Sequence, residues 1–132
     1  MKSYNSKDIG NIGEMAICRY LTDLNFEVVC TNYTIRGGEV DIIACNDTYI
    51  LFVEVKTRSL NYISSGWDAI TINKKRCILK TASNFCSKYQ VRLQPRFDVA
   101  LVTLNSNLSI ASVEYCSNAF DTTGTGIYIP IL

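Results

Sequence analysis

The 132-residue sequence contains no histidine, only two prolines and no apolar run long enough to cross a membrane. Without imidazole, every mechanism that uses histidine as a general base is excluded, which removes Ser-His, Cys-His and histidine-metal nuclease chemistry together. The polar first ten residues lack the apolar segment of a signal peptide, so we expect a cytoplasmic protein without membrane contacts. These absences indicate one soluble domain whose chemistry depends on side chains other than histidine.

Six cysteines are spread through the sequence without a C-x-x-C pair. Their neighbours are mostly apolar, so we expect reduced and mostly buried side chains that act as small hydrophobic residues. A redox or zinc role is the less favoured alternative. Without histidine, a zinc site would need four thiolates to converge.

The formal net charge is only +1, but charge is segregated along the sequence. Between residues 56 and 96 there are nine basic residues and one acidic residue, Asp68, so this stretch carries +8 and the rest carries −7. Such segregation is typical of a surface that faces phosphate groups. A solvated helix face is the alternative interpretation.

The hydrophobic pattern predicts an α/β fold with the order helix, three strands, helix and two strands. We expect helices over 8–25 and 73–89, and strands over 26–33, 39–45, 49–58, 96–103 and 108–116. The strand-helix-strand crossover predicts that the third and fourth strands are parallel, and the last strand is expected at an edge. We therefore predict a mixed central sheet flanked by helices, in one domain over residues 1–121. Residues 122–132 form a C-terminal extension of unknown role.

Three charged residues interrupt the predicted hairpin over residues 39–58. If its strands pair so that partner numbers sum to 95, Asp41 lies opposite Glu54, and Lys56 follows on the same face. The same register predicts one wholly apolar, buried face, formed by Val40, Ile42, Val53 and Val55.

Opposed carboxylates repel each other unless a proton, a cation or a lysine lies between them. Mg²⁺ or Mn²⁺ suits such a pair, because Mg²⁺ uses one or two carboxylates and completes its shell with waters and phosphate oxygens. Asp41 and Glu54 are therefore candidate metal ligands. Lys56 is a candidate for orienting a water or stabilising charge on a phosphoryl group. A surface ion-pair ladder of small energetic value is the alternative.

Basic residues also follow one side of the predicted helix over 73–89. Together with Asn84, the residues Arg76, Lys80 and Lys88 make an i, i+4 row opposite the apolar stripe. We expect nucleic-acid contacts from this row and from two further residues, Arg58 and Lys74. In the loop before the helix, Tyr62 and Trp67 are candidates for stacking on bases, although local packing is the more common role of such residues.

Seven short motifs lie between residues 8 and 121: Gly10-x-x-Gly13-Glu14, Asn32, GEVDIIA (38–44), FVEVKTR (52–58), Lys74, RFDV (96–99) and NAF (118–120). Together they resemble the YraN/UPF0102 family of small bacterial proteins. That family is placed in the restriction-endonuclease-like PD-(D/E)XK superfamily and is similar in its site to archaeal Holliday junction resolvases. The resemblance implies a restriction-endonuclease-like αβββαβ core.

The resemblance also implies roles for individual residues. Asp41 and Glu54 would be metal ligands, the Val55 carbonyl a third ligand, and Lys56 the catalytic lysine. Glu14 would approach from the first helix, although a solvated helix glutamate is an equal alternative on spacing alone.

The activity implied by the resemblance is a Mg²⁺- or Mn²⁺-dependent endonuclease that hydrolyses phosphodiester bonds in DNA, with branched or junction DNA as a candidate substrate. DNA is the expected partner, RNA stays open as a substrate, and a homodimer stays open as the assembly. The alternatives are a nucleic-acid-binding protein that keeps the nuclease-like fold without cleaving, and a protein-interaction scaffold.

Overall fold

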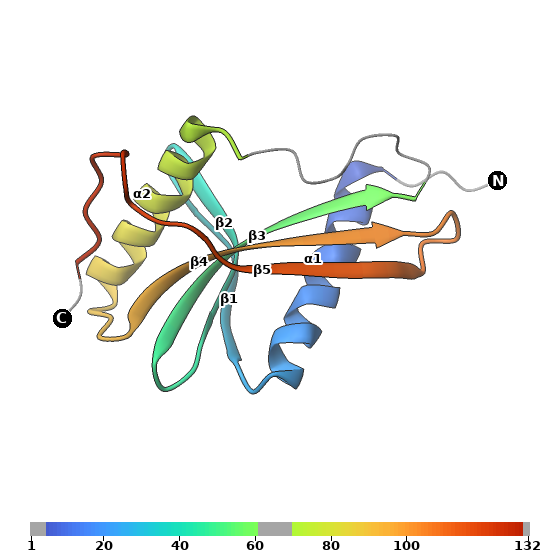
Figure 1. Cartoon of the computed structure of the whole chain (residues 1–132), viewed down its shortest axis with the longest axis horizontal. Coiled ribbons are helices and arrows are strands. Elements are labelled where there is room, and N and C mark those ends of the chain that lie inside the picture. Colours follow the sequence, from blue (N-terminus) through green and yellow to red (C-terminus); the bar gives the residue numbers. More distant parts are fainter. Residues whose placement is uncertain (1–4, 61–69, 131–132) are drawn as a thin grey trace.

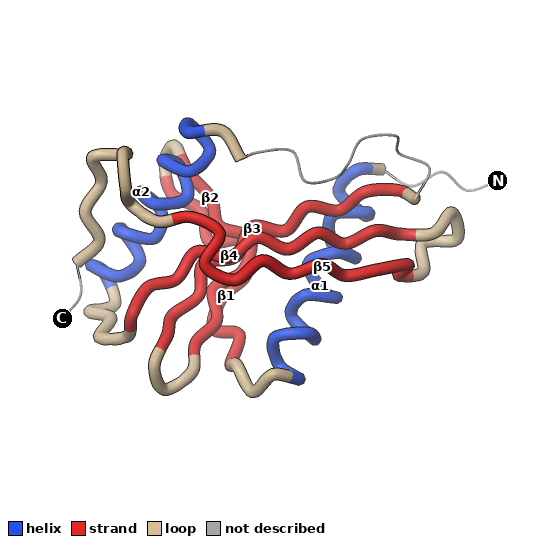
Figure 2. Tube along the Cα trace, in the orientation of Figure 1, coloured by secondary structure: helices blue, strands red, loops and turns tan. Residues whose placement is uncertain are grey.

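The computed structural model describes residues 5–60 and 70–130 and contains two helices and five strands in this part of the chain (Figure 1; Figure 2). The elements are α1 (Ser6–Asp23), β1 (Glu27–Ile35), β2 (Gly38–Cys45), β3 (Tyr49–Ser59), α2 (Ile72–Lys88), β4 (Gln94–Leu104) and β5 (Ile110–Phe120). Their order and types are those predicted from the sequence, and the largest boundary difference is that β5 continues to Phe120. Tyr62 and Trp67 lie outside the described residues. Among the helices described, none has the length and apolar character needed to cross a membrane.

The five strands form one mixed sheet in the order β1-β2-β3-β4-β5. Neighbouring strands are antiparallel except for β3 and β4, which run parallel from Tyr49–Gln94 to Ser59–Leu104. This confirms the predicted parallel pairing across the helix and the predicted edge position of the last strand.

Alternate residues of the central strands contribute to two separate cores. Ile43 of β2 packs in the core beneath α2 with Ile78, whereas its neighbour Ile42 packs in the core beneath α1 with Ile17. Because successive residues of a strand point to opposite faces, the two helices cover opposite faces of the sheet. Figure 1 shows α1 and α2 at different ends of the twisted sheet as well.

The predicted register of β2 against β3 is confirmed as far as Ile42–Val53, where the paired residues end. The expectation of one continuous apolar face is wrong at Val40, which packs in the core beneath α2 rather than with Ile42. The start of β2 lies against α2 so closely that a Cβ on Gly38 would be 2.8 Å from the Cys77 carbonyl oxygen. The start of β2 thus packs against α2, and the β2–β3 ladder opens there, since no pair continues from Ile42–Val53 toward Gly38.

All six cysteines are free thiols, as expected. The expectation that they are mostly buried is wrong, because Cys86 alone is buried while Cys116 on the edge strand is exposed. Cys18 and Cys77 lie on the two helices, Cys30 and Cys45 lie on β1 and β2, and all four are half-buried.

An ion pair within β4, between Arg96 and Asp98, is linked to β5 by hydrogen bonds. Asp98 is 0% exposed, and its carboxylate accepts hydrogen bonds from Arg96 Nε at 3.0 Å, from the Tyr115 hydroxyl and from the Asn118 backbone N–H at 2.8 Å. Asn118 has a φ of 54°, a left-handed conformation that asparagine adopts more readily than most residues. The RFDV and NAF motifs therefore meet in a structural network.

The same network removes one basic residue from the predicted phosphate-facing surface. The side chain of Arg96 is 19% exposed and pairs with Asp98 at 2.9 Å. Its guanidinium also lies 5.1 Å from the ring centre of Tyr49 and 5.8 Å from that of Phe26. Arg96 is therefore part of the packing of the sheet.

The chain after β5 returns to α2 (Figure 1). The Ser83 hydroxyl donates a hydrogen bond to the Tyr128 carbonyl at 3.1 Å, and Ile129 is buried in the core beneath α2. The described part of the predicted C-terminal extension thus completes a core of the domain.

Replacing Asp98 with alanine is expected to lower the free energy of unfolding by about 3–5 kcal/mol, because Arg96 is then left partly buried without its anion. Urea unfolding followed by circular dichroism measures the change. The control Glu114→Ala removes an exposed carboxylate from β5 and should change stability by less than about 0.5 kcal/mol. An Asp98→Ala protein as stable as the control would contradict the structural role.

Candidate metal and nucleic-acid site

Asp41 and Glu54 lie where the β2–β3 ladder opens. The Asp41 carboxylate accepts the Val55 backbone N–H at 2.8 Å, and the two carboxyl groups are hydrogen-bonded to each other. Asp41 is half-buried, and the side chain of Glu54 is 12% exposed. The structure therefore brings together the two acids that the predicted register placed opposite each other.

The environment of this pair disfavours two negative charges. The pKa of Glu54 is raised from 4.5 to about 7, mainly by burial and then by the Asp41 charge, while Lys74 opposes the rise. Burial also raises the pKa of Asp41, against the lowering effect of its hydrogen bonds with Val55 and Glu54. The pair consequently favours a proton or another cation beside it.

Lys74 supplies one positive charge from the first turn of α2. Its Nζ lies 3.3 Å from Glu54 Oε1, and its side chain is 48% exposed. Thr71 caps the helix by accepting the Lys74 backbone N–H at 3.2 Å, which fixes where the helix begins. The structure thus places this predicted phosphate contact beside the carboxyl pair.

Glu14 approaches from the opposite layer. Helix α1 packs so closely on β3 that a Cβ on Gly13 would lie 1.8 Å from Thr57 Oγ1. The next residue, Glu14, accepts a hydrogen bond from Asn32 Nδ2 at 3.0 Å. Burial raises the pKa of Glu14, the Asn32 bond lowers it, and the nearby Asp41 charge raises it. Glu14 is therefore within electrostatic reach of the pair.

Asn32 is a site residue to which the sequence analysis gave no role. It falls opposite Asp41 in the β1–β2 register, and its φ of 52° is left-handed. Its side chain links β1 to Glu14. The sequence signal was an asparagine within a strand otherwise rich in β-branched and aromatic residues, but only the fold shows its partner.

Lys56 and Arg58 continue the face of β3 that bears Glu54, because residues i, i+2 and i+4 of a strand share a face. Both are half-buried. Arg58 Nε donates a hydrogen bond to Thr103 Oγ1 of β4 at 3.1 Å. Lys56 therefore has its predicted place next to the pair, and Arg58 is tied to the neighbouring strand.

The predicted basic row is exposed along α2, at Arg76, Lys80 and Lys88. Asn84 of the same row accepts a hydrogen bond from the Tyr33 hydroxyl at 2.6 Å, which places that part of the row toward β1. Arg76 follows Lys74 by two residues, so the row begins close to Lys74 in sequence but lies on another side of the helix.

The sequence matches the model of the uncharacterised protein family UPF0102 over residues 13–102. The chain belongs to the UPF0102 family. A UPF0102 protein of Caldanaerobacter subterraneus subsp. tengcongensis is 34% identical over 122 residues, which cover 91% of this chain and 100% of that protein. A UPF0102 protein of Clostridium botulinum strain Hall is 38% identical over 119 residues, covering 89% and 97%. The family resemblance is thereby confirmed, and these names indicate no function.

The donor set of this UPF0102 protein suits a hard divalent cation. Within residues 5–60 and 70–130, no three acidic or cysteine side chains lie close enough together to hold a metal ion. The site instead offers two adjacent carboxylates, Asp41 and Glu54, a number that Mg²⁺ commonly uses together with waters and phosphate oxygens. Zinc would require three or four protein ligands.

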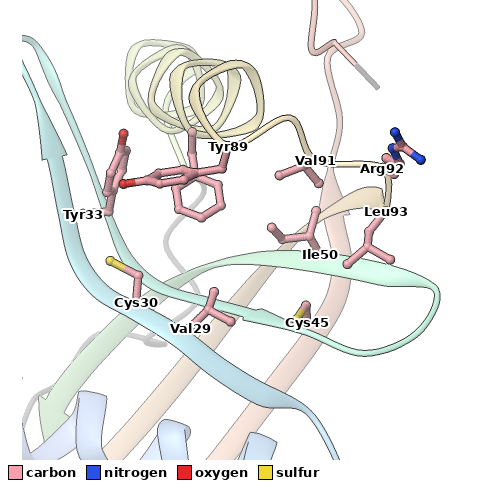
Figure 3. A pocket seen from close by; sticks show the side chains of 10 residues that line it. Val29, Cys30, Tyr33, Cys45, Ile50, Tyr89, Val91, Arg92 and Leu93 are labelled. Atoms are coloured by element: carbon pink, nitrogen blue, oxygen red, sulfur yellow. The ribbon is translucent and has the colours of Figure 1, made fainter. Parts of the chain in front are cut away.

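A separate hollow of about 470 Å³ lies between β1 and the C-terminal end of α2 (Figure 3). Tyr89 lines its helix side, while Tyr33, Cys30 and Cys45 project from the strands. No carboxylate is among its described lining residues. The hollow is therefore distinct from the carboxyl pair, and it explains why these two thiols are only half-buried.

Replacing Glu54 with glutamine is expected to stabilise the metal-free protein above pH 7. The raised folded-state pKa of Glu54 means that wild-type stability is full below pH 4.5 and is lost as pH rises through about 7. Glutamine avoids that loss, so the variant should be more stable than wild type at pH 8 by between about 1 and 3 kcal/mol, and about equally stable at pH 4.5.

Urea unfolding in EDTA at pH 4.5 and pH 8 measures this difference. The control Glu39→Gln removes an exposed carboxylate from the same strand as Asp41 and should show no such pH-dependent gain. A Glu54→Gln protein less stable than wild type at pH 8 would show that the Lys74 ion pair outweighs burial and repulsion.

Proposed function

We propose that this UPF0102 protein is a Mg²⁺- or Mn²⁺-dependent endonuclease that hydrolyses phosphodiester bonds in DNA. The observation that supports the proposal is the half-buried Asp41–Glu54 pair, whose burial and mutual repulsion disfavour its charged form, with Lys56 on the same face. A protein that only binds phosphates gains nothing from carboxylates beside them. The resemblance to the PD-(D/E)XK superfamily supports the same activity.

Asp41 and Glu54 would hold the ion, and the resemblance adds the Val55 carbonyl. When bound, Mg²⁺ would supply polarisation of the phosphate and a water of lowered pKa for in-line attack. The donor set supports this assignment, since both carboxyl groups sit at one opening of the sheet and favour a positive neighbour.

The chain's own residues have distinct parts in this scheme. Lys56 lies about 6.5 Å further along the strand than Glu54, where its ammonium would stabilise charge on a phosphoryl oxygen or orient the attacking water. Glu14, anchored by Asn32, would hold water on the α1 side of Asp41.

The exposed row on α2 supports a nucleic-acid substrate, since it places three cations on the helix whose first turn reaches the carboxyl pair. Among DNA structures, the resemblance to junction resolvases favours branched or junction DNA, and RNA remains a substrate to be compared with it. A homodimeric assembly is part of the proposal on the same grounds, and the cytoplasmic location expected from the sequence is part of it as well.

The alternative is a nucleic-acid-binding protein that does not cleave. The Lys74–Glu54 ion pair favours it, because a lysine already offsets part of the charge that would attract a metal ion. Cleavage of labelled single-stranded, duplex, flapped and four-way-junction DNA and RNA, with Mg²⁺ and Mn²⁺, decides between the two functions.

Asp41→Ala is expected to abolish Mn²⁺ binding measured by titration calorimetry, because it removes one of the two carboxylates. The control Asp47→Ala removes an exposed carboxylate from the adjoining turn and should leave binding unchanged. Equal Mn²⁺ binding by wild type and Asp41→Ala would contradict the assignment of this site.

Lys56→Met is expected to lower the cleavage rate by about 10²-fold or more, the usual scale for losing such a group, while binding to the same DNA changes little. Single-turnover cleavage and electrophoretic mobility shift measure the two quantities. Wild-type cleavage by a folded Lys56→Met protein would refute the catalytic role of Lys56.

Arg76→Ala, Lys80→Ala and Lys88→Ala together are expected to reduce the slope of log K against log salt for DNA binding. Each lost phosphate contact should lower the slope by about 0.9. The matched control replaces three exposed cations elsewhere, Lys7, Arg19 and Arg36, and should keep the wild-type slope. An unchanged slope in the α2 variant would show that DNA binds to another surface of the protein.

A further inference from the structure

The first turn of α2 carries two cations, Lys74 and Lys75, and no acid, and Arg76 follows directly. Positive charges at a helix N-terminus oppose the helix dipole and lower helix stability. Lys74 offsets this effect by pairing with Glu54 on β3, with Nζ 3.3 Å from Oε1. The position of Lys74 is thus explained by the carboxyl pair and not by the helix itself.

Lys74 contacts the same carboxylate that would bind a divalent cation. An ammonium 3.3 Å from Glu54 Oε1 and a divalent ion on that carboxylate repel each other strongly. The Lys74 side chain is 48% exposed, and its long stem can turn into solvent without disturbing either core. Displacement of Lys74 therefore requires only a change of rotamer.

We propose that Lys74 is a positioning residue that exchanges partners at this site. It pairs with Glu54 when the carboxyl pair holds no divalent cation, and it turns to a phosphate of the nucleic acid when the cation takes its place. This inference rests on the proposed function, because it assigns the cation to Asp41 and Glu54. Its consequence is positive coupling, since each of the two ligands then favours the binding of the other.

Lys75 offers a matched control on the same helical turn. Its ammonium lies 5.9 Å from the ring centre of Phe120, so it has a partner on β5. Lys75→Met removes the same charge from the same turn and leaves the Glu54–Lys74 pair in place.

Calorimetric titration with Mn²⁺ alone tests the first half of the exchange. Lys74→Met should bind Mn²⁺ at least about fivefold more tightly than wild type, because the competing ammonium is gone. Lys74→Arg should stay near wild type, and Lys75→Met should differ by less than about twofold. Equal or weaker Mn²⁺ affinity in Lys74→Met would overturn the exchange, since removing an ammonium that competes for Glu54 must tighten binding.

Binding of a fluorescent duplex DNA in EDTA tests the second half without cleavage. In the wild-type background Lys74→Met should weaken binding by less than about twofold, because Lys74 is held by Glu54. In the Glu54→Gln background the same change should weaken binding by about fivefold, because Lys74 has been released to the phosphates. Lys75→Met should weaken DNA binding by the same factor in both backgrounds. The same loss from Lys74→Met in both backgrounds would overturn the exchange.

The two proposals fail in different ways. If neither wild type nor Lys74→Met binds Mn²⁺, the proposed function is overturned and the inference with it. If wild type binds Mn²⁺, Asp41→Ala does not, and Lys74→Met matches wild type, only the inference is overturned. Circular dichroism establishes that each variant is folded, and Lys74→Gln replaces Lys74→Met if the latter aggregates.

Discussion

The arrangement of this domain around its site depends on two carboxyl groups, Asp41 and Glu54, that share a hydrogen bond where the β2–β3 ladder opens. Their burial makes a double negative charge unfavourable, and each surrounding contact reduces that cost in part. The Val55 N–H binds Asp41, the Lys74 ammonium binds Glu54, and a proton on Glu54 is retained up to about pH 7. A divalent cation would do the same, so the groups that stabilise the metal-free pair are also those that a metal must replace.

Close helix contacts explain how residues from both faces of the sheet reach this pair. A Cβ on Gly13 would overlap Thr57, and a Cβ on Gly38 would approach the Cys77 carbonyl oxygen, so α1 and the start of β2 lie nearer their neighbours than larger side chains allow. The first contact places Glu14 beside β1, and the second lies where the β2–β3 ladder opens. Lys74 from α2 and Glu14 from α1 therefore approach the carboxyl pair from opposite layers.

The features predictable from the sequence are those set by local periodicity. Alternation of apolar residues was sufficient to predict the register through Ile42–Val53, because a slip of one residue would expose an apolar face. The position of Val40 was not predictable, since it depends on the approach of α2. The partners of Asn32 and Lys74 also come from distant elements, and no local pattern encodes them. Arg96 was counted toward a basic surface, although its spacing of two residues from Asp98 on one strand could have indicated their pairing.

The two acidic centres, Asp98 and the Asp41–Glu54 pair, differ in how completely their charges are compensated, and this difference separates a structural role from the proposed functional one. Asp98 is fully buried, yet Arg96, Tyr115 and the Asn118 N–H together hold its carboxylate, so the network is satisfied without any ligand. It fixes β4 against β5, and β4 in turn pairs with the whole length of β3, which carries Glu54. The Asp98 network, whose charges are compensated, therefore keeps β3 rigid through its pairing with β4. Glu54 of the less compensated pair lies on β3. A carboxyl pair that repels itself can keep its geometry only on such a support, because a flexible strand would relax by moving the two charges apart.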